Sequence, residues 1–190
     1  MSKSLKMLGF TFSNTPTIQA QLNYLTRKAN KRMFLLLNYK RSGVPKDKLR
    51  DIYCAMSRSI IEYTSNVYHS LINRGQSNEL EKIQKCCLRI IYRYNYDYNQ
   101  HLELAGLQTL ERRREINFEK FTRKTSKNQK YHHWFPKNPS ERTNRNTALY
   151  KEETSVGNRL YNSPIFAMRR LLNHFSAREE IDIPELFNTP

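Results

Sequence analysis

The chain has 190 residues and a formal net charge of +16. This charge exceeds the magnitude of about 2–8 that solubility alone requires of a small domain, so it indicates a polyanionic partner. No apolar run approaches the ~18 residues of a membrane helix, which excludes membrane-embedded classes, and we expect no membrane association.

The positive charge is unevenly distributed. Residues 1–135 hold 25 Lys and Arg against 10 Asp and Glu, a net of +15, whereas residues 136–190 hold 8 against 7, a net of +1. We therefore expect the polyanion-binding surface in the first two thirds of the chain. The first apolar stretch is too short for a signal peptide, and three cysteines at no framework spacing favour a reducing compartment, so we expect a nuclear or cytoplasmic location.

The first predicted element is a strand over residues 7–12, MLGFTF, which is aromatic and β-prone. We find no partner strand later in the chain, so this strand has either lost its sheet or found an improvised neighbour. A helix then begins at Thr15-Pro16. Its buried side is predicted by an apolar spacing of three and four residues at Ile18, Leu22, Leu25, Ala29, Met33 and Leu36.

Three more helices are expected before residue 130. The second begins at Pro45, ends near Arg74-Gly75, and buries one apolar face, Leu49, Ile52, Tyr53, Met56, Ile60, Tyr63 and Val67. The third starts at Ser77 or Asn78 and buries Leu80, Ile83, Cys87, Ile90 and Ile91. Residues 96–106 connect it, through a short helical turn, to a fourth helix that runs from Thr109 to about Lys127 with Leu110, Phe118 and Phe121 as its apolar side.

Residues after 135 read as a polar linker, followed by a short helix near 163–175 and a poorly ordered C-terminal tail. The fold class is therefore predicted as mainly α, with one N-terminal strand. The chain lacks a Gly-rich phosphate loop, and none of its four aspartates adjoins another acidic residue. We expect no catalytic residue and no cofactor.

Two short motifs resemble metal sites. Cys86 and Cys87 are adjacent on a helix and point about 100° apart, so we interpret them as packed helix, with Cys87 as a buried thiol, and assign no metal. Tyr131-His132-His133-Trp134 has no cysteine in reach, and we interpret it as an aromatic plug.

Basic residues on the third helix give the strongest binding signal. Lys82, Lys85, Arg89 and Arg93 share one helix face, and Tyr92, Tyr94, Tyr96 and Tyr98 follow directly. This pattern suits phosphate contacts with stacking. It equally suits a solvated face with the tyrosines packed inward, and the uneven charge favours binding.

The motifs LGFTF, LTRKANKRMFLL, KRSGVPKDKLRDIY, SIIEYTSNVYH, LEKIQKCCLRIIY, AGLQTLERRRE and HHWFP follow one another over residues 7–135. Their order and spacing closely resemble the C-terminal part of LINE-type (non-LTR, jockey-like) retrotransposon reverse transcriptases. The resemblance implies that Leu8-Gly9 ends a palm remnant in residues 1–14, that residues 15–135 form a helical thumb-like bundle, and that residues 136–190 are a linker and tail. The family's polymerase aspartates lie upstream of these motifs, so no catalytic residue is carried over.

The sequence thus predicts a truncated reverse-transcriptase thumb that binds duplex or RNA/DNA hybrid without reading sequence and without polymerase activity of its own. A palm-containing reverse transcriptase is a further expected partner; no small-molecule substrate is expected. The residues expected to bind nucleic acid are Arg27, Lys28, Lys31, Arg32, Lys82, Lys85, Arg89, Arg93, Arg113 and Arg114. Two alternatives stay open: a basic module that docks on an acidic protein or on the palm, and a nuclease whose acidic metal ligands the sequence does not reveal.

Overall fold

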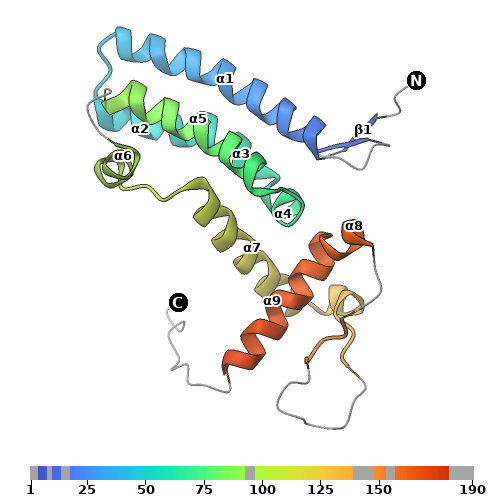
Figure 1. The fold of residues 1–190 in the computed structure, drawn as a ribbon. Helices are drawn as coiled ribbons and strands as arrows, with labels where there is room; N and C mark the ends of the chain where they lie inside the picture. The colour runs from blue at the N-terminus through green and yellow to red at the C-terminus, as the bar shows by residue number, and fades with distance from the viewer. Residues whose placement is uncertain are drawn as a thin grey trace. The chain divides into compact units, whose positions relative to one another are not determined.

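The computed structural model describes residues 4–7, 10–13, 18–92, 97–138, 148–152 and 157–179. Within them the protein is mainly helical, which confirms the predicted fold class (Figure 1). The chain forms two compact units, Met1–Asn117 and Phe118–Pro190. The sequence places a boundary after residue 135 instead. Of the last fifteen residues, which we expect to be a poorly ordered tail, residues 176–179 are helical and residues 180–190 lie outside the described residues.

The N-terminal strand has a partner. Strands β1 (Ser4–Met7) and β2 (Phe10–Ser13) pair antiparallel, so the expectation of a lone strand is wrong. Four residues in β1 are too few for an alternating pattern to be recognised. Phe10 is buried in the core of the first unit, so β2 contributes to that core. Leu8-Gly9 lies outside the described residues.

Helix α1 (Gln19–Arg41) has the buried side that its sequence predicts. Leu22, Leu25, Ala29 and Leu36 are all buried. The helix ends at Ser42, whose N–H donates to the Asn38 carbonyl, and Gly43 follows at φ 81, a backbone conformation that favours glycine. The expected helix start at Thr15-Pro16 lies outside the described residues.

The second helical stretch contains a π-helical turn, and this turn changes which residues are buried. It comprises α2 (Lys46–Tyr53), the π turn η1 (Cys54–Arg58), α3 (Ser59–Tyr63) and α4 (Ser65–Tyr68). A π turn inserts one residue, so every later position moves by one on the helix face. Leu49 and Tyr53 are buried as predicted. Beyond η1 the buried residues are Ile61, Thr64, Ser65 and Tyr68, whereas the predicted Ile60, Tyr63 and Val67 are not fully buried.

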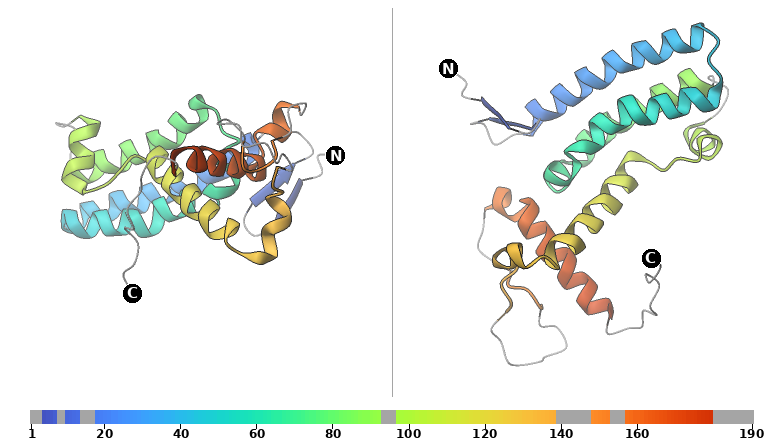
Figure 2. Two further views of the ribbon diagram at one scale, coloured as in Figure 1. Left: turned by 90° about the horizontal axis from the view of Figure 1, so that it is seen from below. Right: turned by 180° about the vertical axis from the view of Figure 1, so that it is seen from behind.

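Helix α5 (Arg74–Tyr92) begins earlier than predicted. The Asn73 Oδ1 accepts the Gln76 N–H at 2.9 Å, and the Gln76 Oε1 accepts the Asn73 N–H at 3.0 Å. This reciprocal cap starts the helix at Arg74, so Gly75 lies in its first turn and does not end the preceding helix. Helices α1 and α5 lie side by side and run parallel (Figures 1 and 2), because Gln19 contacts Gln76 at their starts and the Lys40 ammonium donates to the Ile90 carbonyl near their ends.

The connector contains a complete short helix, α6 (Tyr98–Ala105). Asp97 and Gln100 form a capping box at its start, and Gly106 ends it at φ 61. Helix α7 (Leu110–Ser126) follows, with the Thr109 hydroxyl accepting the Arg112 N–H at 3.2 Å. The predicted fourth helix is therefore confirmed.

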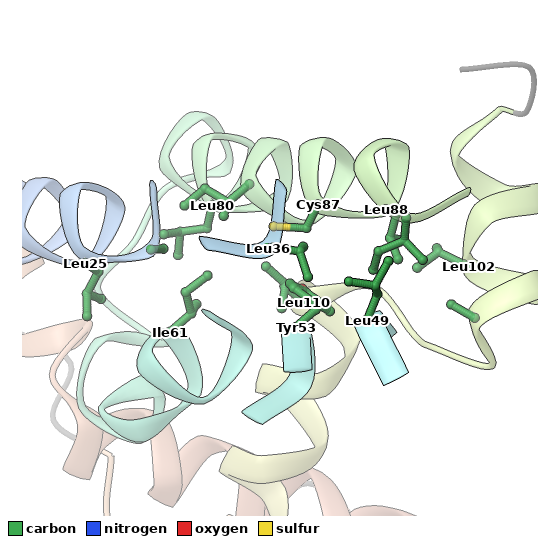
Figure 3. Packing of buried hydrophobic residues seen from close by; sticks show 14 of the residues in the cluster. Leu25, Leu36, Leu49, Tyr53, Ile61, Leu80, Cys87, Leu88, Leu102 and Leu110 are labelled. Atoms are coloured by element: carbon green, nitrogen blue, oxygen red, sulfur yellow. The ribbon is translucent and has the colours of Figure 1, made fainter. Parts of the chain in front are cut away.

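The core of the first unit combines an apolar layer with a buried polar network. Leucines from α1, α2 and α5 meet around Tyr53 and Cys87 (Figure 3). The Gln84 amide lies at the centre of the network: its Oε1 accepts the Tyr53 hydroxyl at 2.6 Å, and its Nε2 donates to the Tyr98 hydroxyl at 2.9 Å and to the Gln108 carbonyl at 3.0 Å. These bonds tie α2, α5, α6 and the segment before α7 together.

The second unit has a smaller core, Phe118, Phe135, Met168 and Leu172. It comprises the end of α7, a 3₁₀ helix η2 (Gln129–Trp134), a bridge between Lys137 and Tyr150, and helices α8 (Asn158–Tyr161) and α9 (Pro164–Glu179). The helix predicted near 163–175 is α9. Residues of the expected linker, Lys137 and Tyr150, pair with each other, and Tyr150 packs against this core.

Candidate nucleic-acid interface

The outward side of α1 is a strongly basic surface. The helix contains six basic residues and no acidic one, a net of +6 over Gln19–Arg41. Arg27 and Lys31 are exposed, four residues apart, on the side opposite the buried leucines. Phe34, one turn beyond Lys31, is 60% exposed. The two cations can contact phosphates, and the exposed ring beside them can stack on a base.

Lys28 and Arg32 lie on a different side of α1. The Gln21 Nε2 donates to the Thr64 hydroxyl at 3.4 Å, so this side of the helix faces the junction of α3 and α4. Lys28 and Arg32 follow Gln21 by 7 and 11 residues and therefore extend along the same side. The Lys28 ammonium lies 5.7 Å from the centre of the Tyr24 ring. We call Arg27, Lys28, Lys31 and Arg32 the α1 surface.

The expected basic residues of α5 form a second set, which we call the α5 surface: Lys82, Lys85 and Arg89. Lys82 and Arg89 are exposed, two turns apart, and neither forms an ion pair within the described part of the chain. Lys85 is half-buried, with its ammonium 4.8 Å from the centre of the Tyr98 ring. Arg93 lies outside the described residues.

The structure does not bring the two surfaces together. Helix α1 faces α5 through Gln19 and Lys40, whereas Lys28 and Arg32 lie on the side that faces α3 and α4. Arg27 and Lys31 point away from the bundle. Lys28 and Arg32 therefore lie on a different side of α1 from the one that faces α5.

The tyrosines that follow the α5 cations are packed inward where they are described. Tyr92 is buried, and its hydroxyl donates to the Leu104 carbonyl at 3.4 Å. The Tyr98 hydroxyl bonds to Glu81 and Gln84, and burial is the main cause that raises its pKa. For Tyr92 and Tyr98 the structure therefore favours the alternative, tyrosines packed inward, because both hydroxyls bond within the unit. Tyr94 and Tyr96 lie outside the described residues.

Two expected binding residues on α7 are structural instead. The Arg113 guanidinium donates through two nitrogens to the Glu62 carboxylate, which also pairs with Arg58 at 3.4 Å, and the bond to Glu62 is the main cause that raises the Arg113 pKa. Arg114 is 2% exposed and donates to the Ser77 hydroxyl. Neither guanidinium is presented to a phosphate: one is held by a carboxylate and the other is inside the unit.

The paired cysteines have different surroundings, as their spacing on the helix predicts. Cys87 is buried among the core leucines (Figure 3), and burial raises its pKa to about 12, whereas Cys86 is exposed. In the described ranges no three His, Cys, Asp or Glu side chains are grouped so that they could hold a metal ion. Tyr131 and Trp134 pack against the second core as the aromatic-plug interpretation predicts, while His132 and His133 are exposed.

Phe34 is the residue that sequence reasoning missed on the α1 surface. Its spacing of three from Lys31 places it on the outward side of α1, and this spacing could have revealed it.

Comparison with family models, curated proteins and solved structures gives no match for this chain. Among the residues that the structure describes, none of the helices has the length and apolar character needed to span a bilayer. The resemblance to LINE-type reverse transcriptases therefore stays a sequence-based prediction.

Proposed function

We propose that the first unit binds duplex or RNA/DNA hybrid nucleic acid through its phosphates, as a thumb-like module of the LINE-type reverse-transcriptase kind. The observation that supports this function best is the α1 surface, since its four cations lie on a 23-residue helix that has a net charge of +6 and contains no acidic residue. Cations held on a rigid helix neutralise phosphates and release counterions, which favours binding without selecting a base sequence.

The α5 surface adds contacts on another side of the same unit. Lys82 and Arg89 are exposed and project from a helix whose backbone the Gln84 network anchors. With two separate basic sides, the unit contacts one long nucleic acid that wraps around it, or two segments of nucleic acid at once. Polymerisation is not part of the proposal, because the resemblance covers motifs that follow the family's catalytic palm.

The test measures binding to a 20-base-pair RNA/DNA hybrid by fluorescence anisotropy over a range of salt concentrations. Each phosphate contact adds about 0.7–0.9 to the slope of log affinity against log salt. The double variants Arg27→Gln/Lys31→Gln and Lys82→Gln/Arg89→Gln should each lower the slope by about 1.4–1.8 and weaken binding to every sequence alike.

Lys46 and Lys48 provide the matched control, since both are exposed and lie in the first turn of α2. Lys46→Gln/Lys48→Gln removes the same charge and should leave the slope nearly unchanged. The proposal is wrong if the surface variants behave like this control. It is also wrong if polyglutamate competes as well as the hybrid, because that result identifies an acidic protein as the partner.

A further inference from the structure

The second unit has a basic surface of its own. Residues 118–134 contain five basic residues against one acidic residue, a net of +4. Three of the lysines, Lys120, Lys124 and Lys127, are exposed on α7. Their spacing of four and three residues places them on one side of the helix, over about 10 Å of its length.

The arginine among these lysines has a structural role. The Arg123 guanidinium lies 3.4 Å from the Glu119 carboxylate and 4.1 Å from the centre of the Phe175 ring on α9. The negative charge of Glu119 therefore neutralises the positive charge of Arg123. The three lysines form no ion pair within the described ranges, so their charge is available to a partner.

An exposed aromatic side chain lies beside the lysines. Phe121 is 38% exposed, and it belongs neither to the buried core of the second unit nor to the apolar residues packed against that core. It follows Lys120 directly and precedes Lys124 by three residues, so a ligand on the lysines also reaches the ring. The sequence pattern assigns Phe121 to the apolar side of the helix, but Thr122 and Thr125 are buried there instead.

We propose that Lys120, Phe121, Lys124 and Lys127 form a binding surface for single-stranded nucleic acid. The lysines neutralise the phosphates, and a base stacks on the Phe121 ring. A duplex keeps its bases stacked on each other, so only a single strand offers a base to this ring. The inference rests on the proposed function only in assigning nucleic acid as the partner.

The experiment uses the full chain and two fluorescein-labelled probes, a dT20 oligonucleotide and the 20-base-pair hybrid. Phe121→Ala should weaken dT20 binding about 5- to 150-fold, the range for losing one stacked base, and should leave hybrid binding on the first unit unchanged. Phe121→Trp should preserve dT20 binding, since it preserves a stacking surface. Lys120→Gln/Lys124→Gln should lower the dT20 salt slope by about 1.4.

Tyr63→Ala and Lys46→Gln/Lys48→Gln are the matched controls, because Tyr63 is a 73% exposed aromatic residue of the first unit. Circular dichroism checks that each variant stays folded. If Phe121→Ala changes dT20 binding no more than Tyr63→Ala does, the inference fails while hybrid binding still supports the proposed function. If dT20 binding depends on Phe121 but the α1 and α5 variants match their control, the proposed function fails alone. A wild-type protein that binds neither probe contradicts both.

Discussion

The two units differ in the size of their cores and in the partners of their packed arginines. In the first unit an apolar core and the Gln84 network hold the helices together, and the packed arginines have polar partners, Glu62 for Arg113 and Ser77 for Arg114. Among the described residues of the second unit, four hydrophobic side chains are buried. Arginine side chains supply further packing contacts there.

Arg169 and Arg170 illustrate these packing contacts. The Arg169 Nε donates to the Trp134 carbonyl at 2.7 Å, and its guanidinium lies 4.9 Å from the centre of the Phe166 ring. The Arg170 guanidinium lies 3.9 Å from the centre of the Tyr161 ring and donates to the Tyr161 carbonyl at 2.6 Å. A count of basic residues therefore overestimates the charge available for binding, because part of it packs on aromatic rings.

The largest expected effect tests the apolar core of the first unit. Leu88 is fully buried on α5, and Leu88→Ala should lower the free energy of unfolding by about 3–5 kcal/mol through lost contacts and a cavity. Leu172→Ala in the smaller core should cost less, about 2–3 kcal/mol. Urea unfolding followed by circular dichroism measures both. Equal losses would mean that the two cores are packed alike.

The hairpin prediction asks whether the N-terminal strands belong to the first unit. Phe10 is 8% exposed within its core, so Phe10→Ala should cost about 3 kcal/mol. An exposed remnant of a missing sheet would instead tolerate this change within about 0.5 kcal/mol. The same urea experiment distinguishes these outcomes, with Tyr63→Ala as the exposed aromatic control.

The adjacent cysteines provide a smaller comparison within one helix. Cys87→Ala should cost about 1–3 kcal/mol because it removes a buried thiol, whereas Cys86→Ala should change stability by less than about 0.5 kcal/mol. Neither change should alter hybrid binding or its salt slope, and zinc chelators should have no effect. If a cysteine variant loses binding while its urea unfolding midpoint is unchanged, our assignment of the binding surface to the Lys82 and Arg89 side of α5 is wrong.

The parts of the fold that the sequence predicts correctly are those where one pattern dominates. The spacing of Leu22, Leu25, Ala29 and Leu36 is regular, and α1 buries these residues. The buried side after η1 could not be predicted, because hydrophobic spacing assumes a regular helix and a π turn adds one residue. The start of α5 was missed because Gly75 resembles a helix end, while the Asn73–Gln76 cap overrides it.

The candidate site shows a similar limit. In the sequence, Arg113 and Lys31 are both basic residues on predicted helices. In the structure, Arg113 pairs with Glu62, which is distant in the chain, whereas no described acidic residue pairs with Lys31. A tertiary partner of this kind leaves no local signal. The outward cations of α1 and α5 were predictable because they lie opposite a clear apolar side.

The smallest expected effect concerns pH and tests the packing of the first unit around α7. Burial is the main cause that lowers the pKa of His69, and the Arg114 guanidinium lowers it further, while Glu115 and Glu111 act in the opposite direction. A histidine whose pKa is lower in the folded state binds fewer protons there than in the unfolded chain. Stability therefore decreases as the pH falls from above the ordinary histidine pKa of about 6.5 toward the lower folded value.

The measurement compares urea midpoints at pH 7.5 and pH 5.5 for the wild type and His69→Gln. The wild type should lose more stability on acidification than the variant, because glutamine binds no proton in this range. His132→Gln, a change at an exposed histidine of the second unit, is the control and should keep the wild-type pH dependence. If His69→Gln keeps the wild-type pH dependence too, His69 is not desolvated in the folded protein. The packing of His69 and Arg114 in one interior would then be wrong.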